Sequence, residues 1–203
     1  VVFCSGVSYK WILGVLAVLF PLGVVFVYML QYEMIPFLRG YYATRILAWI
    51  NPKEYSDAYW QQENSIMAIG SGQLWGKGLN NTEIASVKNG NFLSEEQTDF
   101  IFAIICEEIG FVGAMIVIAL FLLLVYECLM MAYRAKDLSG RLICTGMATL
   151  LAFQSFANIA VATAIFPNTG LPLPFVSYGV SSLLSLYIGI GVVLNVGLQR
   201  RYS

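Results

Sequence analysis

Asp99 is the residue of this sequence best placed to do chemistry. It ends a polar stretch, residues 94–99, and the apolar run 100–106 begins directly after it. A carboxylate at the edge of an apolar segment is costly to keep, and ionisable groups of this kind commonly serve function. The competing interpretation is a helix N-cap, because an Asp side chain and a helix N-terminus stabilise each other. Position alone leaves both interpretations open and favours the cap.

The composition indicates an integral membrane protein. The chain has 203 residues, of which 59% are hydrophobic and 11% charged, and its mean hydropathy is +0.73, outside the range of ordinary soluble domains. A net charge of −1 offers no basic face for nucleic acid. The absence of His excludes Ser-His and Cys-His catalysis and the usual zinc sites. Chemistry must therefore come from carboxylates, Lys, Arg, hydroxyls or the backbone.

Four apolar segments are long enough to cross a bilayer as helices, which takes about 20 residues. They cover about 11–31, 100–131, 142–165 and 176–198. We therefore predict an all-α fold, a polytopic transmembrane helical bundle that forms a single membrane domain over residues 1–203. The chain opens on Val1 inside an apolar stretch, so we expect it to be a fragment of a longer protein.

Two of the three connections between these segments carry further motifs. The long one, residues 33–98, contains two helix-like patches at 37–50 and 59–69. A glycine-rich stretch follows, in which Gly76 and Gly78 allow tight turns or close approach of the backbone to a ligand. The short one, residues 166–175, holds three prolines, which end one helix and delay the next.

The short basic segments set the expected orientation. With four crossings, Lys10, the loop 133–141 and Arg200 fall on one side, which the positive-inside rule makes cytoplasmic. The long loop and the proline turn are then both extracytoplasmic. This places Asp99 and the proline turn on the same membrane face.

Five motifs in order identify a known family. The chain resembles the FtsW/RodA/SpoVE (SEDS) family over about residues 10–201. The motifs are Asn51-Pro52, Gly70-Ser-Gly-x-Leu-Trp-Gly-Lys-Gly78, Thr98-Asp-Phe-Ile-Phe-Ala103, Glu107-Glu108-x-Gly110 and Thr169-Gly-Leu-Pro-Leu-Pro-Phe-Val-Ser-Tyr-Gly179. One departure is that Val180 stands where the family commonly has a second glycine.

The resemblance implies the C-terminal part of a multi-pass protein of the bacterial cytoplasmic membrane, from about its seventh helix onward, with its C-terminus in the cytoplasm. Such proteins polymerise lipid II into β-1,4 glycan strands at the outer face of the membrane, beside a class B penicillin-binding protein. They act in cell division or in the maintenance of cell shape, and sporulation relatives share the motifs. The family's catalytic aspartate matches Asp99, which would take the proton of the attacking hydroxyl.

The pyrophosphate leaving group needs cations or oriented amides. Lys77 is the first candidate, with Arg45 and Arg39 behind it. The alternative for Lys77 is a loop lysine that reaches to the lipid headgroups. Glu107 and Glu108 point about 100° apart on a helix, and a structural hydrogen bond or a wet cavity is favoured over catalysis for them.

The proline turn also has two interpretations. Pro172 and Pro174 make a rigid scaffold around the cavity, while Ser177 and Tyr178 are positioned to contact substrate. The scaffold is the favoured interpretation. The resemblance also implies a divalent cation, Mg²⁺ or Mn²⁺, in some relatives, but no ligand cluster is legible in the sequence, so the metal is left unassigned.

Two other functions fit the same features. A flippase could use intramembrane carboxylates and helix ends to move a lipid-linked peptidoglycan precursor across the bilayer, and the chain could also serve only as a scaffold for a partner. The place of Asp99 at the outer edge, beside a glycine-rich loop, favours chemistry at the membrane surface. Lipid II, a penicillin-binding protein and membrane lipids are therefore the expected partners.

Overall fold

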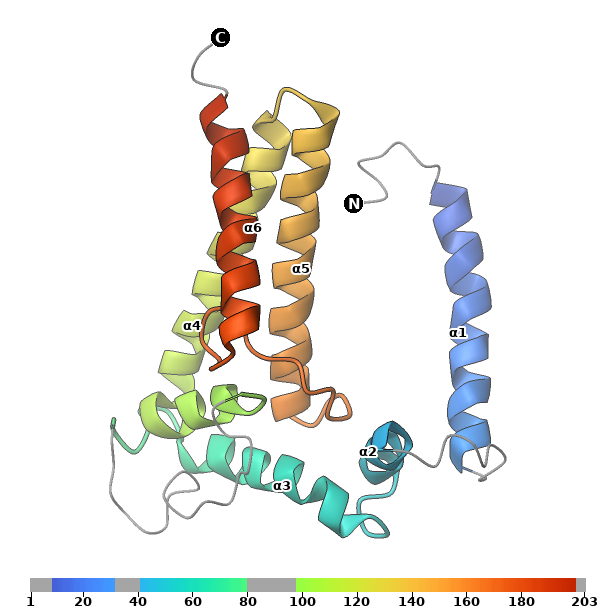
Figure 1. Ribbon diagram of the computed structural model, residues 1–203. Coiled ribbons are helices and arrows are strands. Elements are labelled where there is room, and N and C mark those ends of the chain that lie inside the picture. The colour runs from blue at the N-terminus through green and yellow to red at the C-terminus, as the bar shows by residue number, and fades with distance from the viewer. Residues whose placement is uncertain (1–8, 32–40, 80–97, 200–203) are drawn as a thin grey trace. The chain divides into compact units, whose positions relative to one another are not determined.

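The computed structural model describes residues 9–31, 41–79 and 98–199. Its regular structure in these ranges consists of helices (Figure 1), so the predicted all-α fold is confirmed. The helices are α1 (Tyr9–Gln31), α2 (Tyr41–Ile50), α3 (Ser56–Ser71), α4 (Ile101–Arg134), α5 (Leu138–Ala162) and α6 (Val180–Leu198).

The chain divides into two compact units, Val1–Tyr59 and Trp60–Ser203. The first unit contains α1, a helix of 23 residues, and the amphipathic α2. The apolar segment described within α1 is Leu13–Phe26, shorter than a full span. The segment 11–31 is therefore helical as expected, but its passage through a membrane stays a prediction. The grouping of the whole chain into one membrane domain also stays a prediction.

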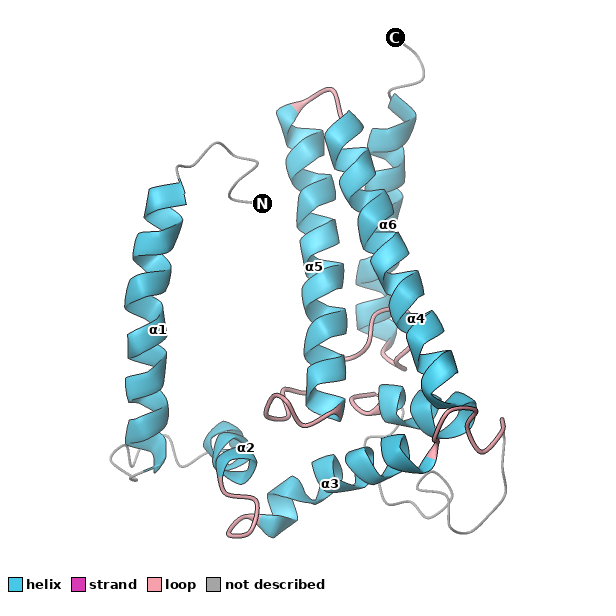
Figure 2. Ribbon diagram, turned by 180° about the vertical axis from the view of Figure 1, so that it is seen from behind, coloured by secondary structure: helices cyan, strands magenta, loops and turns pink. Residues whose placement is uncertain are grey.

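The second unit holds three helices that are long and apolar enough to cross a membrane, α4, α5 and α6. They run side by side (Figure 2). Small residues allow this close packing: the sulfur of Met147 lies against Gly189, and that of Met131 against Gly197. A buried apolar cluster that includes Cys144, Leu151 and Leu186 joins the three helices. Three of the four predicted crossings are thus confirmed by length and composition.

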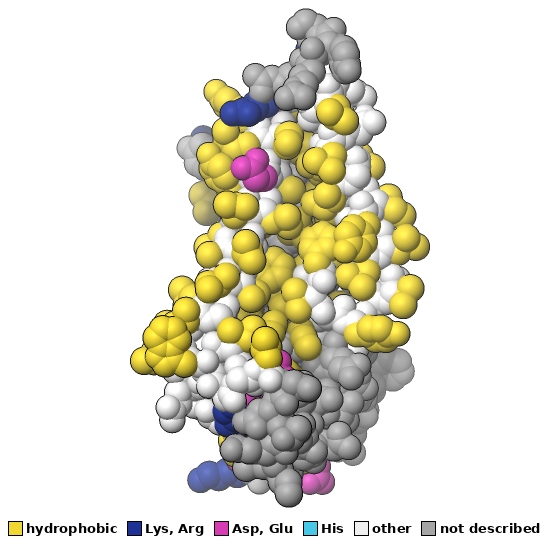
Figure 3. Space-filling view, turned by 90° about the vertical axis from the view of Figure 1, so that its left-hand side faces the viewer, with side chains coloured by type: hydrophobic (Ala, Val, Ile, Leu, Met, Phe, Trp, Pro, Cys, Tyr) yellow, Lys and Arg dark blue, Asp and Glu magenta, His cyan; other side chains and the backbone are white. Residues whose placement is uncertain are grey.

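Large apolar side chains face outward from these helices. Leu122 of α4 is 66% exposed and Ile188 of α6 is 61% exposed. Figure 3 shows hydrophobic side chains over the middle of one face and charged ones toward its ends. In water such a surface is a liability, whereas in hydrocarbon it is the expected surface of a membrane helix. The basic residues Arg134, Lys136 and Arg141 lie at the end where α4 passes into α5.

The polar helix α3 covers the other end of α5 from Trp60 onward. Gln62 Nε2 donates to the carbonyls of Val161 (3.2 Å) and Phe166 (2.8 Å), and Ser65 Oγ donates to Ala162 O at 2.8 Å. The last carbonyls of a helix have no partner within it. The side chains of α3 supply these partners, which fixes α3 across the end of the bundle.

Candidate functional site

Helix α4 is broken at Gly110, where φ is 74° and ψ is −171°. A continuous helix would join the N–H of Phe111 to the carbonyl of Glu107, and that of Val112 to Glu108, because each N–H bonds the carbonyl four residues earlier. Non-helical dihedrals at Gly110 prevent both bonds. Two donors and two acceptors are left inside the apolar segment, where each needs a partner.

The glycine-rich segment 73–78 supplies all four partners. The N–H groups of Lys77 and Gly78 donate to Glu107 O (2.9 Å) and Glu108 O (3.0 Å). Phe111 N and Val112 N donate in turn to the carbonyls of Gln73 (2.8 Å) and Leu74 (3.2 Å). The segment therefore docks into the helix break and replaces the missing helical bonds, so its backbone approaches α4 rather than a ligand.

This docking brings two backbones so close that side chains are excluded. A Cβ on Gly76, which has a φ of 77°, would overlap the Glu108 carbonyl, and a Cβ on Gly110 would lie 2.6 Å from Leu74 O. Gly78 also has a positive φ, 93°. Gly76 and Gly110 are thus required by the approach of the two segments, whereas at Gly78 a Cβ would meet open space and only the positive φ favours glycine.

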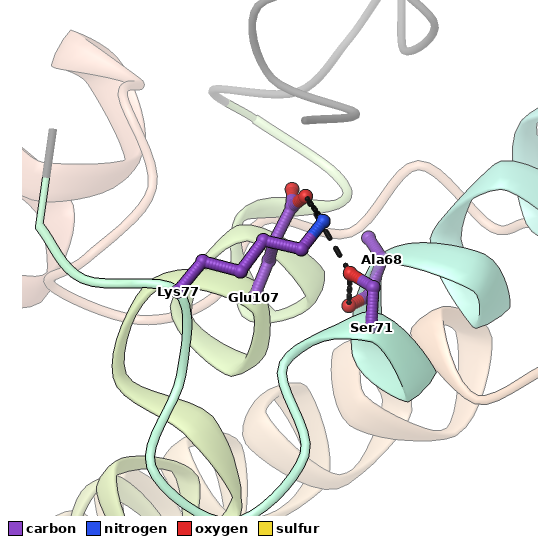
Figure 4. A network of polar contacts seen from close by, with 4 residues as sticks. All are labelled: Ala68, Ser71, Lys77 and Glu107. Carbon is purple, nitrogen blue, oxygen red and sulfur yellow. Dashed lines mark hydrogen bonds and ion pairs between the residues drawn. The ribbon is translucent and has the colours of Figure 1, made fainter. Parts of the chain in front are cut away.

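Lys77 and Glu107 form an ion pair at this junction (Figure 4). Lys77 Nζ lies 2.7 Å from Glu107 Oε1, and the two side chains are 23% and 2% exposed. Ser71 Oγ, which donates to Ala68 O at 2.8 Å, lies 3.5 Å from the same carboxylate oxygen. The lysine therefore neutralises a buried carboxylate. This geometry favours structural roles for both residues; Glu108 is partly exposed.

We expect Lys77→Met to destabilise the fold, because it leaves Glu107 buried without its cation. Breaking a fully buried pair costs roughly 3–5 kcal/mol; with Lys77 partly exposed we expect about 2–3 kcal/mol, and Lys77→Met/Glu107→Gln should recover part of it. Thermal unfolding in detergent measures both. A Lys77→Met variant that unfolds like the unaltered protein but no longer turns over lipid II would instead support a role in binding the pyrophosphate.

Asp99 lies directly before α4 and is partly exposed. The N-cap of α4 is Phe100, whose side chain makes no capping hydrogen bond, so the predicted capping position of Asp99 is wrong by one residue. Phe100 is 0% exposed and packs in a cluster with Ala103 and Val161. The burial of Phe100 explains why the N-cap lies one residue later than expected. Phe100 packs in the core, and Asp99 stays at the surface beside it.

Two side chains from elsewhere hold the backbone at Asp99. Asn158 Nδ2 of α5 donates to Asp99 O at 2.8 Å and to Leu171 O at 2.7 Å. Ser177 Oγ donates to Thr98 O at 2.6 Å and accepts from Leu173 N at 2.7 Å. We call these residues, Thr98, Asp99, Asn158, Leu171 and Ser177, the Asp99 clasp. It joins the start of α4, the last turns of α5 and the proline turn.

The proline turn is itself fixed on α5. Gln154 Nε2 donates to Pro172 O at 2.9 Å, and Pro174 is fully buried. Ser177 is 3% exposed and its hydroxyl is already bonded twice, whereas Tyr178 is 69% exposed. Pro174 and Ser177 are therefore enclosed in the packed turn, which favours the scaffold interpretation of this segment. The substrate contact predicted for Ser177 and Tyr178 stays a prediction, and of these two side chains only Tyr178 is exposed.

The other predicted site residues are not members of the Asp99 clasp. Lys77 and Glu107 pair at the helix break instead. Arg45 belongs to α2, in the separate unit Val1–Tyr59, and Arg39 lies outside the described residues. The assignment of these arginines to the pyrophosphate stays a prediction from the sequence.

The described ranges contain no group of three or more His, Cys, Asp or Glu side chains able to hold a metal ion. The metal stays unassigned, and we derive no step through a cation. The sequence reasoning missed two residues here, Asn158 and Gln154. The sequence contains a signal for both residues. Two amides four residues apart share one helix face, and here they stand in a span without any charge.

The fold and the site define a multi-pass helical membrane protein with a carboxylate at the entrance of a broken helix. A family model described as "Cell cycle protein" (FtsW, RodA and SpoVE) matches residues 1–202. The chain belongs to this family, as the sequence motifs indicated.

Curated relatives and solved structures agree. The chain is 36% identical over 200 residues to a "Probable peptidoglycan glycosyltransferase FtsW" of Geobacter sp. (strain M18), covering 98% of this chain and 51% of the relative. It is 39% identical over 163 residues to stage V sporulation protein E of Bacillus subtilis (strain 168), covering 80% and 43%. The chain thus spans about half the length of these relatives.

A chain from a structure of a "peptidoglycan synthase complex" matches with a TM-score of 0.66 and 29% identity, over 94% of this chain and 50% of that one. A mutant of the rod shape determining protein RodA from Thermus thermophilus matches with a TM-score of 0.51 and 30% identity, over 79% and 50%. The membrane helical bundle is therefore the fold of solved members of the family.

Proposed function

We propose that this chain carries the catalytic carboxylate of a peptidoglycan glycosyltransferase, which polymerises lipid II into β-1,4 glycan strands. Relatives named as probable peptidoglycan glycosyltransferases support this proposal. The observation that carries the proposal is the Asp99 clasp. The carboxylate of Asp99 is partly exposed, and the backbone next to it is held by hydrogen bonds from Asn158 and Ser177. A catalytic group held in a fixed place by packed neighbours is what proton transfer in a transition state requires.

The reaction needs one proton acceptor. The acceptor sugar's hydroxyl oxygen attacks the anomeric carbon of the donor, and a new C–O bond forms as the bond to the lipid pyrophosphate breaks. Asp99 takes the hydroxyl proton, and the bonding electrons leave with the pyrophosphate. General-base catalysis of this kind contributes typically 10²–10⁴-fold to a rate.

We place this chemistry at the outer face of the cytoplasmic membrane. Arg134, Lys136 and Arg141 lie at the opposite end of the bundle from Asp99, and basic residues in short loops favour the cytoplasm. Asp99, the proline turn and α3 are then extracytoplasmic, where the glycan strand is built.

A class B penicillin-binding protein is the proposed partner. The exposed apolar side chains of α4 and α6 suit contact with another membrane helix, and a similar solved chain comes from a complex described as coordinating polymerization and crosslinking. Crosslinking would consume the strands that the transferase produces.

The test is to incubate the complete protein with purified lipid II and to separate the products on a gel. We expect a ladder of glycan strands. A flippase moves its substrate unchanged, so intact lipid II with no polymer would favour transport over transfer.

A further inference from the structure

Asn158 is the most enclosed polar residue of the Asp99 clasp. It lies in α5 and is 0% exposed. Its Nδ2 reaches two carbonyl oxygens, those of Asp99 and Leu171. Since both partners are acceptors, the nitrogen of the amide must face them, and its two hydrogens serve one carbonyl each. The orientation of the side chain is thus fixed by its partners.

No other side chain of this size provides the same link. Asp has the same shape as Asn but no hydrogen to donate when ionised, and Leu has no polar atom. The Asn158 Oδ1 atom, in contrast, is buried with no hydrogen-bond partner among the residues that the structure describes. The double donor is what the position uses.

We propose that Asn158 is a positioning residue for the base Asp99, an inference that rests on the proposed function. It ties the backbone of Asp99 to that of Leu171, so the carboxylate and the proline turn keep one relative position. Asn158 does not touch substrate, because it is fully buried. It affects the reaction only by fixing the position of the Asp99 carboxylate.

Gln154 provides a matched control. It lies one turn before Asn158 on the same helix and also donates to a carbonyl of the proline turn, that of Pro172, at 2.9 Å. This hydrogen bond does not involve Asp99. Replacing either amide by Ala removes a donor to the turn, and only Asn158→Ala releases the carbonyl of Asp99.

The experiment compares Asn158→Ala and Gln154→Ala in the complete protein by kcat and KM for lipid II, with thermal unfolding as the measure of folding. A displacement of about 1 Å can cost 10²-fold in rate, so we expect Asn158→Ala to lower kcat about 100-fold with KM within about threefold. Gln154→Ala should lower kcat less than about tenfold at a similar unfolding temperature. If Asn158→Ala does not fold, Asn158→Gln keeps both hydrogens and should give an intermediate kcat.

Equal kcat values for the Asn158 and Gln154 variants would overturn the inference, as would a loss of activity that lies entirely in KM. The same holds if Asn158→Gln folds and retains the full kcat. In each case the unaltered protein still polymerises lipid II and the proposed function stands. Absence of polymer from the unaltered protein would instead overturn the proposed function, and the inference with it.

Discussion

Asp99→Asn is expected to remove polymerisation of lipid II, with a loss on the order of 10³-fold, inside the range typical for a general base. Asparagine has nearly the same size as aspartate but cannot take the proton of the attacking hydroxyl. The fold should survive, because the clasp bonds the backbone carbonyls of Thr98 and Asp99 rather than the carboxylate. Gel analysis of the glycan products and thermal unfolding together measure the two effects.

Asp137→Asn is the matched control. Asp137 is an exposed aspartate at the opposite end of the bundle, and as N-cap of α5 it makes no side-chain capping hydrogen bond. The same chemical change should therefore leave both polymerisation and unfolding unaltered. Full activity of Asp99→Asn would show that another group accepts the proton.

Gly110→Ala is expected to have the largest effect on stability. The dihedrals of Gly110, 74° and −171°, lie in a region that is essentially restricted to glycine, and such strain costs about 1–3 kcal/mol. The new Cβ would also lie 2.6 Å from Leu74 O, and overpacking costs typically about 1–3 kcal/mol more. We therefore expect a loss of about 3 kcal/mol or more, measured as a lower unfolding temperature in detergent.

Gly70→Ala separates this effect from a general intolerance of alanine. Gly70 is in α3, is exposed, and has open space where a Cβ would lie, so alanine there should be neutral or stabilising by up to about 1 kcal/mol. Equal unfolding temperatures for the Gly110 and Gly70 variants would mean that the segment 73–78 does not dock into α4 as described.

Much of the fold could be predicted from the sequence, because a membrane span needs a long apolar run and such runs are visible directly. The helix around 142–165 became α5, Leu138–Ala162, and the patch at 59–69 became α3, Ser56–Ser71. Counting crossings predicted only that Asp99 and the proline turn share one membrane face, and their connection through Asn158 and Ser177 is a finding of the structure.

The break in α4 could not be predicted from its local sequence. The partners of its broken backbone bonds lie 30 or more residues earlier, at Gln73–Gly78, and their contact is a tertiary event. The pairing of Lys77 with Glu107 could not be predicted for the same reason, because it also joins two segments that are distant in the sequence. A local sequence pattern shows which polar groups need a hydrogen-bond partner, whereas the tertiary fold determines which residue provides it.

Asn158 was a different case. The sequence shows an amide in an uncharged span, which in a membrane helix indicates a hydrogen bond to a neighbouring segment. The two carbonyls that it reaches belong to turns, and backbone acceptors leave no mark on a sequence. The type of the residue was thus legible and its partners were not.

The most direct test of the central claim, that Asp99 is the base of a glycosyl transfer, counts the lipid pyrophosphate released from lipid II by the complete protein in vesicles. Each glycosidic bond should release one carrier. We expect release in step with bond formation by the unaltered protein and by Asp137→Asn, and none above background by Asp99→Asn. Equal release by Asp99→Asn, or transfer of intact lipid II between the leaflets with no release by any variant, would contradict the account.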